Sequence, residues 1–213
     1  MRALKKAVLG TSTVQLVDKI YRVAYEARCC SEESDYRILA RLAHGRTCVF
    51  DIGANIGASA LVMASNLSSG GVLYTFEPAE SACLTIRENA MLNGLEERLR
   101  IINALVGATS GSIAEFHWDM VSERLSTLME TPSGMSLPLL KTTLAIDDFV
   151  RQLGLVPEFV KIDVEGAESQ VLRGMKGVLT NSKPLVFVEL HVWPGVSAED
   201  NAALLFSTLA DTN

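Results

Sequence analysis

The feature that most constrains the fold is a regular alternation of two kinds of segment after Gly45. Short runs rich in β-branched and aromatic residues alternate with longer segments of helical periodicity. Five runs predict strands: CVFDIG (48–53), VLYTFEP (72–78), LRIINALV (99–106), FVKIDVEG (159–166) and PLVFVELHVW (184–193). Parallel strands need long crossover connections, and these connections cover both faces of the sheet. We therefore predict a doubly wound, mostly parallel, Rossmann-like α/β sheet.

The segments between these runs predict helices. They are NIGASALVMASNL (55–67), ESACLTIRENAML (80–92), TTLAIDDFVRQLG (142–154), AESQVLRGMKGVL (167–179) and SAEDNAALLFSTLA (197–210). Residues 13–43 predict two further helices with a break near CCSEESD, where Ser31 or Ser34 could cap the second. The pattern loosens from 108 to about 140, where GSIAEFHW (111–118) predicts an edge strand. We expect an N-terminal helical segment, 1–45, and a single compact unit, 46–213.

Composition excludes several classes of protein. The 213 residues are 48% hydrophobic and 21% charged, as in a globular chain, and the net charge of −6 offers no basic surface for nucleic acid. No apolar run approaches the roughly 20 residues that a membrane helix needs. The four cysteines show neither metal-ligand spacing nor a disulfide framework. We expect a cytoplasmic protein with reduced thiols.

The first strand ends in the turn DIGANIG. Ligands of doubly wound sheets bind beyond the carboxyl ends of the strands, and Gly53 and Gly57 permit both a sharp turn and a close approach of a ligand to the backbone. GANIG does not satisfy GxGxxG, and the carboxylate of Asp51 favours the cationic amino-acid end of a ligand over a pyrophosphate. An ordinary turn with Asp51 as a helix cap remains an alternative.

The second strand ends in Glu77 and Pro78. An acidic residue at this position can accept hydrogen bonds from both hydroxyls of a ribose. The alternative is an acid exposed at a strand end and held rigid by Pro78. Taken together, the two strand ends favour a nucleoside ligand without phosphates, a description that S-adenosylmethionine fits.

The blocks DIGANIG, TFEP, NALVG, KIDVEGAE and VELH, in this order, resemble the FkbM-type family of S-adenosylmethionine-dependent methyltransferases. The resemblance covers roughly residues 46 to 193. It implies the residues that would surround the cofactor. These are Asp51, Gly53, Asn55 and Gly57 at the methionine end, Glu77 at the ribose, and Asn103 or its neighbours near the adenine. We further expect Ala54 and Pro78 to contact the cofactor, and Asp163 could contact either the cofactor or the acceptor.

The chain departs from the family pattern in two places. TTLAIDD carries two extra residues between Leu144 and Asp147, where the family has TLD. We also expect the sequence as given to lack the strand pair that follows the last helix in such methyltransferases, either because the chain is truncated or because that sheet edge is completed differently. We expect an exposed sheet edge that supports association into a homo-oligomer.

Two strand ends carry residues that could bind the methyl acceptor or remove its proton. Asp163 and Glu165 lie two residues apart, as do Glu189 and His191, so each pair shares one face of an extended chain. His191 is the best-matched base for a hydroxyl nucleophile, and Glu189 could orient it or bind the acceptor. Asp163 and Glu189 could instead hold a hard divalent ion. We favour catalysis without a metal.

These observations predict an S-adenosylmethionine-dependent methyltransferase that methylates a hydroxyl of a glycan or of a small natural product. A noncatalytic cofactor-binding module is the first alternative. A Rossmann-type oxidoreductase is the second, although Asp51 and the missing third glycine of the fingerprint argue against it.

Overall fold

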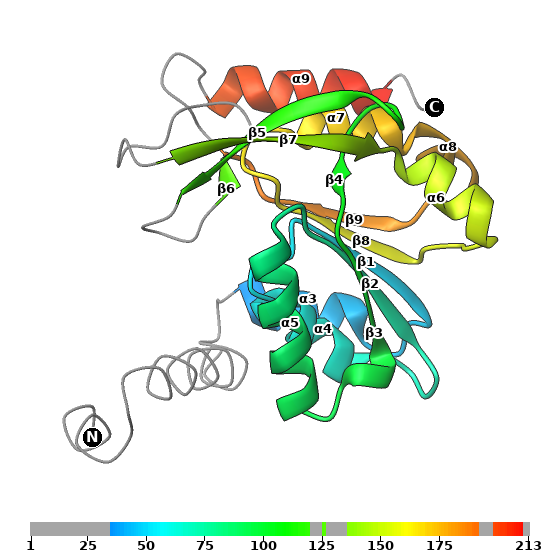
Figure 1. The fold of residues 1–213 in the computed structure, drawn as a ribbon. Helices are drawn as coiled ribbons and strands as arrows, with labels where there is room; N and C mark the ends of the chain where they lie inside the picture. Colours follow the sequence, from blue (N-terminus) through cyan, green and yellow to red (C-terminus); the bar gives the residue numbers. More distant parts are fainter. Residues whose placement is uncertain (1–34, 120–124, 127–135, 192–197, 211–213) are drawn as a thin grey trace.

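The computed structural model describes residues 35–119, 125–126, 136–191 and 198–210. Its central layer is a sheet of five parallel strands: β1 (Cys48–Ile52), β2 (Val72–Phe76), β3 (Leu99–Ile102), β8 (Phe159–Ile162) and β9 (Leu185–Val188). The strand order is β3-β2-β1-β8-β9 (Figure 1). The chain runs outward from β1 to β3 and then crosses back to place β8 beside β1. The predicted doubly wound sheet is confirmed, and its strand order reverses between β1 and β8.

Helices cover both faces of this sheet (Figure 1). One face carries α3 (Asp35–Ala43), α4 (Ala58–Asn66) and α5 (Glu80–Leu92), and the other carries α6 (Ile146–Leu153), α7 (Glu168–Gly174), α8 (Lys176–Asn181) and α9 (Ala198–Ala210). Alternate strand residues face the two layers, because successive side chains of a strand point in opposite directions. Val49 packs among the first group of helices and Phe50 among the second. Each face thus has its own hydrophobic core.

A second sheet lies on the same side as α7 and α9 (Figure 1). It consists of β4 (Leu105–Val106), β5 (Ile113–Asp119), β6 (Leu125–Ser126) and β7 (Ser136–Leu144), in the order β4-β7-β5-β6. The sequence did not predict this sheet. The single strand expected over 99–106 is divided at Asn103 and Ala104, and its second half, β4, pairs with β7. The edge position predicted for 111–118 is wrong, because β5 pairs with β7 on one side and with β6 on the other.

The helix expected over 167–179 is two helices, α7 and α8, with Met175 between them. The end of α7 is packed tightly, since a Cβ on Gly174 would lie 2.0 Å from the carbonyl oxygen of Gly107. The start of α8 is capped by Asp147, whose carboxylate accepts hydrogen bonds from the N–H groups of Gly177 (2.7 Å) and Val178 (2.8 Å). The unusual TTLAIDD block therefore contributes a helix cap.

The N-terminal helical segment is described only in part. The first predicted helix and the caps Ser31 and Ser34 lie outside the described residues, whereas Leu39 and Ala43 of α3 are buried in the core beneath β1. Strand β9 is an edge of the parallel sheet as described, and self-association through it stays a prediction. Among the described residues, no helix combines the length and the apolar character that a membrane span requires.

Candidate active site at the carboxyl ends of the strands

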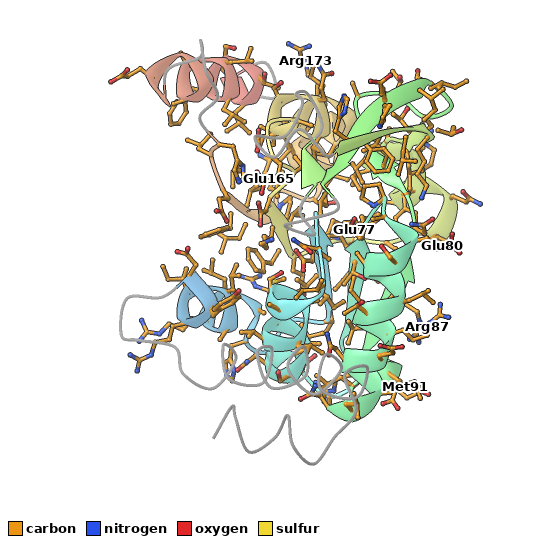
Figure 2. The ribbon with its side chains drawn as sticks, turned by 60° about the vertical axis from the view of Figure 1, so that its left-hand side comes forward. Glu77, Glu80, Arg87, Met91, Glu165 and Arg173 are labelled. Atoms are coloured by element: carbon orange, nitrogen blue, oxygen red, sulfur yellow. The ribbon has the colours of Figure 1, made fainter. Side chains whose placement is uncertain are left out.

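A pocket lies at the carboxyl ends of the central strands, where the strand order reverses. Its walls come from the segments that follow β1, β2, β3 and β8. The lining residues are Ile52, Gly53, Asn55, Phe76, Glu77, Pro78, Ala104, Leu105, Val106, Asp163, Val164, Glu165 and Ala167. Doubly wound sheets bind ligands at this position. Figure 2 shows Glu77 and Glu165 near the middle of the molecule, whereas Arg87 and Met91 follow α5 toward its far end.

The turn after β1 brings two backbones into close contact. Gly53 has φ +82°, and a Cβ at this position would lie 1.7 Å from the carbonyl oxygen of Asp163. Only glycine fits both the conformation and the space. The N–H groups of Gly53 and Ala54 donate to the carbonyl oxygen of Phe76, and Gly57 (φ +93°) precedes the first residue of α4. Gly53 and Asn55 line the pocket, whereas Ala54, which is buried, and Gly57 are not among its lining residues.

Glu77 is the buried acid of the pocket wall. Its Oε2 accepts a hydrogen bond from the N–H of Asn55 (2.8 Å), and its Oε1 accepts one from the N–H of Ala79 (2.9 Å). The residue is fully buried, and desolvation raises the pKa of Glu77 to about 8 despite these two hydrogen bonds. Glu77 is therefore a carboxyl group that a ligand hydroxyl could stabilise in its ionised form.

Asn103 holds the far side of this wall in place. Its Nδ2 donates to the carbonyl oxygens of Glu77 (2.9 Å) and Pro78 (3.0 Å). Its Oδ1 accepts from Nζ of Lys141 (2.5 Å), and Lys141 also donates to the carbonyl oxygen of Pro78. Asn103 is exposed, and its neighbours Ala104–Val106 line the pocket instead. Sequence reasoning missed Lys141, because only the pairing of the second sheet brings it to this wall.

Asp51 lies beneath the pocket and is not among its lining residues. Its Oδ2 accepts a hydrogen bond from Oγ of Ser59 (2.8 Å), and its Oδ1 lies 3.3 Å from Nζ of Lys161. Lys161 also pairs with Oδ2 of Asp163 at 3.0 Å. Burial alone would lower the pKa of Lys161, but the two carboxylates raise it above its ordinary value, so the ammonium stays charged. Asp51 and Lys161 thus form a buried ion pair, and the predicted role of Asp51 at the cofactor stays a prediction. A charged residue inside the buried strand FVKI was the signal that could have identified Lys161.

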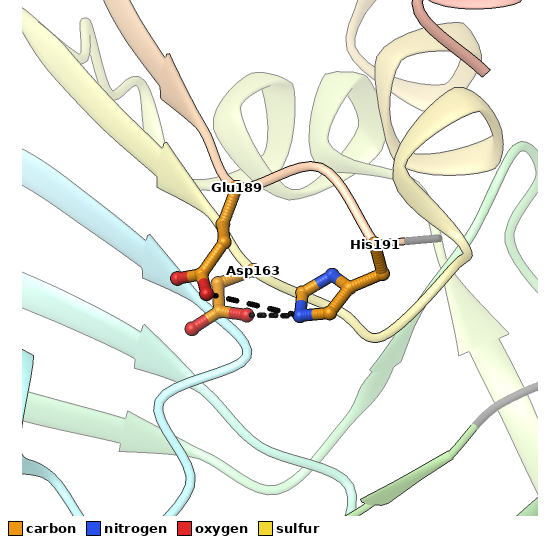
Figure 3. A group of neighbouring side chains, drawn as sticks. All are labelled: Asp163, Glu189 and His191. Atoms are coloured by element: carbon orange, nitrogen blue, oxygen red, sulfur yellow. Dashed lines mark ion pairs between the residues drawn. The ribbon is translucent and has the colours of Figure 1, made fainter. Parts of the chain in front are cut away.

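The acceptor-side candidates meet around one imidazole (Figure 3). Nε2 of His191 lies 3.6 Å from Oδ1 of Asp163, 3.3 Å from Oε2 of Glu165 and 3.9 Å from Oε1 of Glu189. Nδ1 of His191 lies 2.9 Å from Oε1 of Glu168, the first residue of α7. The two residue pairs that the sequence singled out do come together, and Glu168 joins them.

The carboxylates change the chemistry of this ring. The hydrogen bond to Glu168, together with the charges of Glu165 and Asp163, raises the pKa of His191 above its ordinary value. A general base must be neutral when it accepts a proton. A raised pKa narrows the range of pH in which His191 is neutral, so this environment does not favour the role that the sequence suggested for it. That role stays a prediction.

The parallel sheet, the pocket at its switch point and the acidic residue after β2 define a Rossmann-like class of fold with a site suited to a nucleoside ligand. Residues 51–207 match the family described as the methyltransferase FkbM domain. This match covers more than half of the chain. The chain belongs to the FkbM methyltransferase family.

Two similar methyltransferases and one solved structure can be compared with this chain. The hexuronic acid methyltransferase AglP of Haloferax volcanii is 30% identical over 196 residues, which cover 91% of this chain and 74% of AglP. The 2-O-methyltransferase NoeI of Sinorhizobium fredii is 29% identical over 150 residues, or 63% of this chain and 60% of NoeI. The crystal structure of a methyltransferase FkbM from Methylobacillus flagellatus shares the fold, with a TM-score of 0.52 and 15% identity, over 96% of this chain and 54% of that one. The chain thus spans between about half and three quarters of the length of these proteins.

Proposed function

We propose that this protein transfers a methyl group from S-adenosylmethionine to a hydroxyl of a sugar-containing acceptor. The observation that carries the proposal is the pocket itself, which joins Glu77 at the end of β2 to Asp163 and Glu165 at the end of β8. One wall of the pocket therefore presents a carboxyl group suited to a ribose. The opposite edge, called the rim below, carries His191 and the carboxylates around it, which are Asp163, Glu165, Glu168 and Glu189. The alternatives are a noncatalytic cofactor-binding module and an oxidoreductase.

The proposed placement of the cofactor follows the chemistry of the walls. The ribose hydroxyls donate to Glu77, the adenine lies against the apolar Leu105 and Val106, and the methionine end extends over the turn at Gly53 and Asn55. Asn55 Oδ1 is buried without a hydrogen-bond partner among the described residues, so it is available to the amino group of the cofactor. The methyl group would then face the rim formed by Asp163 and Glu165.

The reaction is a displacement at carbon. A lone pair of the acceptor hydroxyl oxygen attacks the methyl carbon, and the carbon–sulfur bond breaks with its electron pair going to sulfur. The sulfonium becomes the neutral thioether of S-adenosylhomocysteine, and the hydroxyl proton passes to a base at the rim or to water. Because the sulfonium is already activated, positioning of the two reactants supplies much of the rate. Asp163, Glu189 and His191 are the proposed acceptor-side residues.

The acceptor class comes from the relatives. AglP is named for hexuronic acid and NoeI for the 2-O position, so we propose a sugar hydroxyl in a glycan or in a small glycosylated natural product. Uronic acid glycosides and the corresponding neutral glycosides are the first acceptors to compare.

Calorimetry tests the cofactor before any acceptor is known. We expect S-adenosylhomocysteine and S-adenosylmethionine to bind in the micromolar range, about −8 kcal/mol, and NAD not to bind. Tight binding of NAD without a response to S-adenosylmethionine would identify the oxidoreductase instead. Incubation with a methyl-labelled donor and the two sets of glycosides then tests transfer. Cofactor binding without transfer to any sugar would support the noncatalytic module.

A further inference from the structure

The two nitrogens of His191 lie in different surroundings. Nδ1 lies 2.9 Å from Oε1 of Glu168, which also accepts a hydrogen bond from the N–H of Gly166 (3.0 Å). Glu168 is fully buried at the start of α7, so this contact fixes the orientation of the ring. A carboxylate accepts hydrogen bonds, so Nδ1 donates to Glu168 and keeps its hydrogen. Nε2 is the nitrogen that would give up its proton to bind a metal ion.

Nε2 faces carboxylate oxygens from two strand ends. Asp163 follows β8, and Glu189 follows β9 (Figure 3). One ligand atom from each of Asp163, Glu189 and His191 can be chosen so that all lie within 4.8 Å of one another. Ligand atoms at about 2.0–2.2 Å from a common ion lie roughly 3–3.6 Å apart unless they face each other across it. Nε2 of His191 already lies 3.6 Å from Oδ1 of Asp163 and 3.9 Å from Oε1 of Glu189, so movements of a few tenths of an ångström would bring these atoms into coordination distance.

The groups behind these ligands are those that metal sites use to orient ligands. A ligating imidazole ordinarily donates its other N–H to a carboxylate, as His191 does to Glu168. The oxygen of Asp163 that does not face His191 is held by Nζ of Lys161 at 3.0 Å. Glu168 Oε2 is buried without a hydrogen-bond partner among the described residues, which leaves negative charge close behind the ring. This charge favours a cation in the cluster.

We propose that Asp163, Glu189 and His191 form a binding site for one divalent transition-metal ion, with Glu165 at its margin. An imidazole nitrogen beside carboxylates suits Mn²⁺, Fe²⁺, Co²⁺ or Zn²⁺ better than the all-oxygen preference of Mg²⁺ or Ca²⁺. Glu189 is the exposed ligand, so the open coordination positions would face solvent, where an acceptor can reach them. The ligand that the ion would take there is a sugar hydroxyl. This role rests on the proposed function, whereas binding of the ion does not.

The test is a titration of the metal-free chain with Mn²⁺, followed by electron paramagnetic resonance of the free ion, without cofactor or acceptor. We expect one saturable site per chain. His191→Ala and the exposed Glu189→Gln should each weaken binding by about 10–100-fold or more, the loss seen even for groups that only orient ligands. Glu97→Gln makes the same chemical change on an exposed residue before β3, at the opposite end of the strands, and should bind Mn²⁺ like the wild type. A competing titration should rank Mg²⁺ as weaker than Mn²⁺.

Absence of a saturable Mn²⁺ site in the wild-type chain would overturn the proposal. So would equal Mn²⁺ affinity in the wild type and Glu189→Gln, provided that circular dichroism shows both to be folded. Failure of the proposed function gives a different result: Mn²⁺ binds as described while S-adenosylmethionine does not. If S-adenosylmethionine binds and Mn²⁺ does not, the metal site alone is refuted.

Discussion

Nζ of Lys161 on β8 lies 3.3 Å from Oδ1 of Asp51, its register partner on β1, and 3.0 Å from Oδ2 of Asp163. Lys161 and Asp51 are both buried. The ammonium therefore links the ends of two central strands below the pocket. A buried charge without its partner is costly, so the three groups depend on one another.

Loss of the ammonium should destabilise the fold. We expect Lys161→Met to lower the free energy of unfolding by about 3–5 kcal/mol, because it leaves the carboxylate of Asp51 buried without a counter-ion. Urea denaturation measures the change. Lys176→Met alters an exposed lysine on α8 and should change stability by no more than about 0.5 kcal/mol. The double variant Lys161→Met/Asp51→Asn should recover part of the loss, and a double variant less stable than Lys161→Met would contradict this explanation.

Replacement of Glu77 should weaken binding of the cofactor. Glu77→Gln puts an amide NH₂ against one of two backbone donors and removes the charge that accepts from the ribose. We expect S-adenosylhomocysteine to bind more weakly by about 1–3 kcal/mol, as measured by calorimetry. Glu80→Gln, an exposed residue at the start of α5, is the matched control and should bind normally. Equal affinities for the two variants would remove Glu77 from the ribose site.

Cofactor affinity should also depend on pH through Glu77. Its pKa is raised to about 8 in the empty pocket, and ribose hydroxyls favour the ionised form, so binding lowers this pKa and releases a proton below about pH 8. Affinity for S-adenosylhomocysteine should therefore increase from pH 6.5 to about 8, by up to about tenfold per pH unit, and then level off. The free energy of unfolding of the unliganded protein should change in the opposite direction. A carboxyl with a raised pKa contributes stability at low pH, and this contribution is lost as pH rises through about 8. Calorimetry at several pH values measures the affinity, and Glu77→Gln should flatten the curve. A wild-type affinity that falls over this range would contradict the assignment.

Gly53 should be far less tolerant of substitution than a surface glycine of similar conformation. A Cβ at Gly53 would lie 1.7 Å from the carbonyl oxygen of Asp163, so Gly53→Ala must push the two turns apart. Gly70 has nearly the same φ, +76°, but open space around its Cβ position, so Gly70→Ala bears the conformational cost alone. We expect that cost to be about 1 kcal/mol and the loss at Gly53 to exceed it by about 2 kcal/mol or more. Thermal unfolding of the two variants measures the difference, and similar losses would show that the turns separate easily.

Self-association through the edge strand β9 stays a prediction. Exposed leucines on and just beyond this strand show which residues to change in order to test it. Leu185 at the start of this edge strand is 43% exposed, as is Leu190 just beyond its end. We expect light scattering to show dimers at high protein concentration and Leu185→Lys to reduce them, because a charge on an edge strand opposes pairing. A monomer at every concentration tested would count against it.

Local patterns determined the elements whose signals lie within a few residues. Helix α5 begins at Glu80 and ends at Leu92, as its periodicity and the following Asn93–Gly94 predicted. The parallel sheet also followed from sequence, because apolar runs separated by helices leave few other topologies. Ligands of doubly wound sheets bind beyond the carboxyl ends of the strands. From this rule the sequence alone predicted that Glu77 and Asp163 share one pocket, as they do.

The tertiary structure decided what depends on pairing between distant segments. The second sheet joins β5 to β7 across residues that carry no strong pattern of their own, and this pairing places Lys141 at the pocket wall. Register across β1 and β8 sets Lys161 opposite Asp51, so this predicted cofactor residue also belongs to a buried ion pair. Packing of α7 brings Glu168 to His191. Sequence determined which side chains lie at the strand ends, because the two-residue period of a strand is local. Only the folded chain determined their partners, because a charge takes its role from groups that are near it in space.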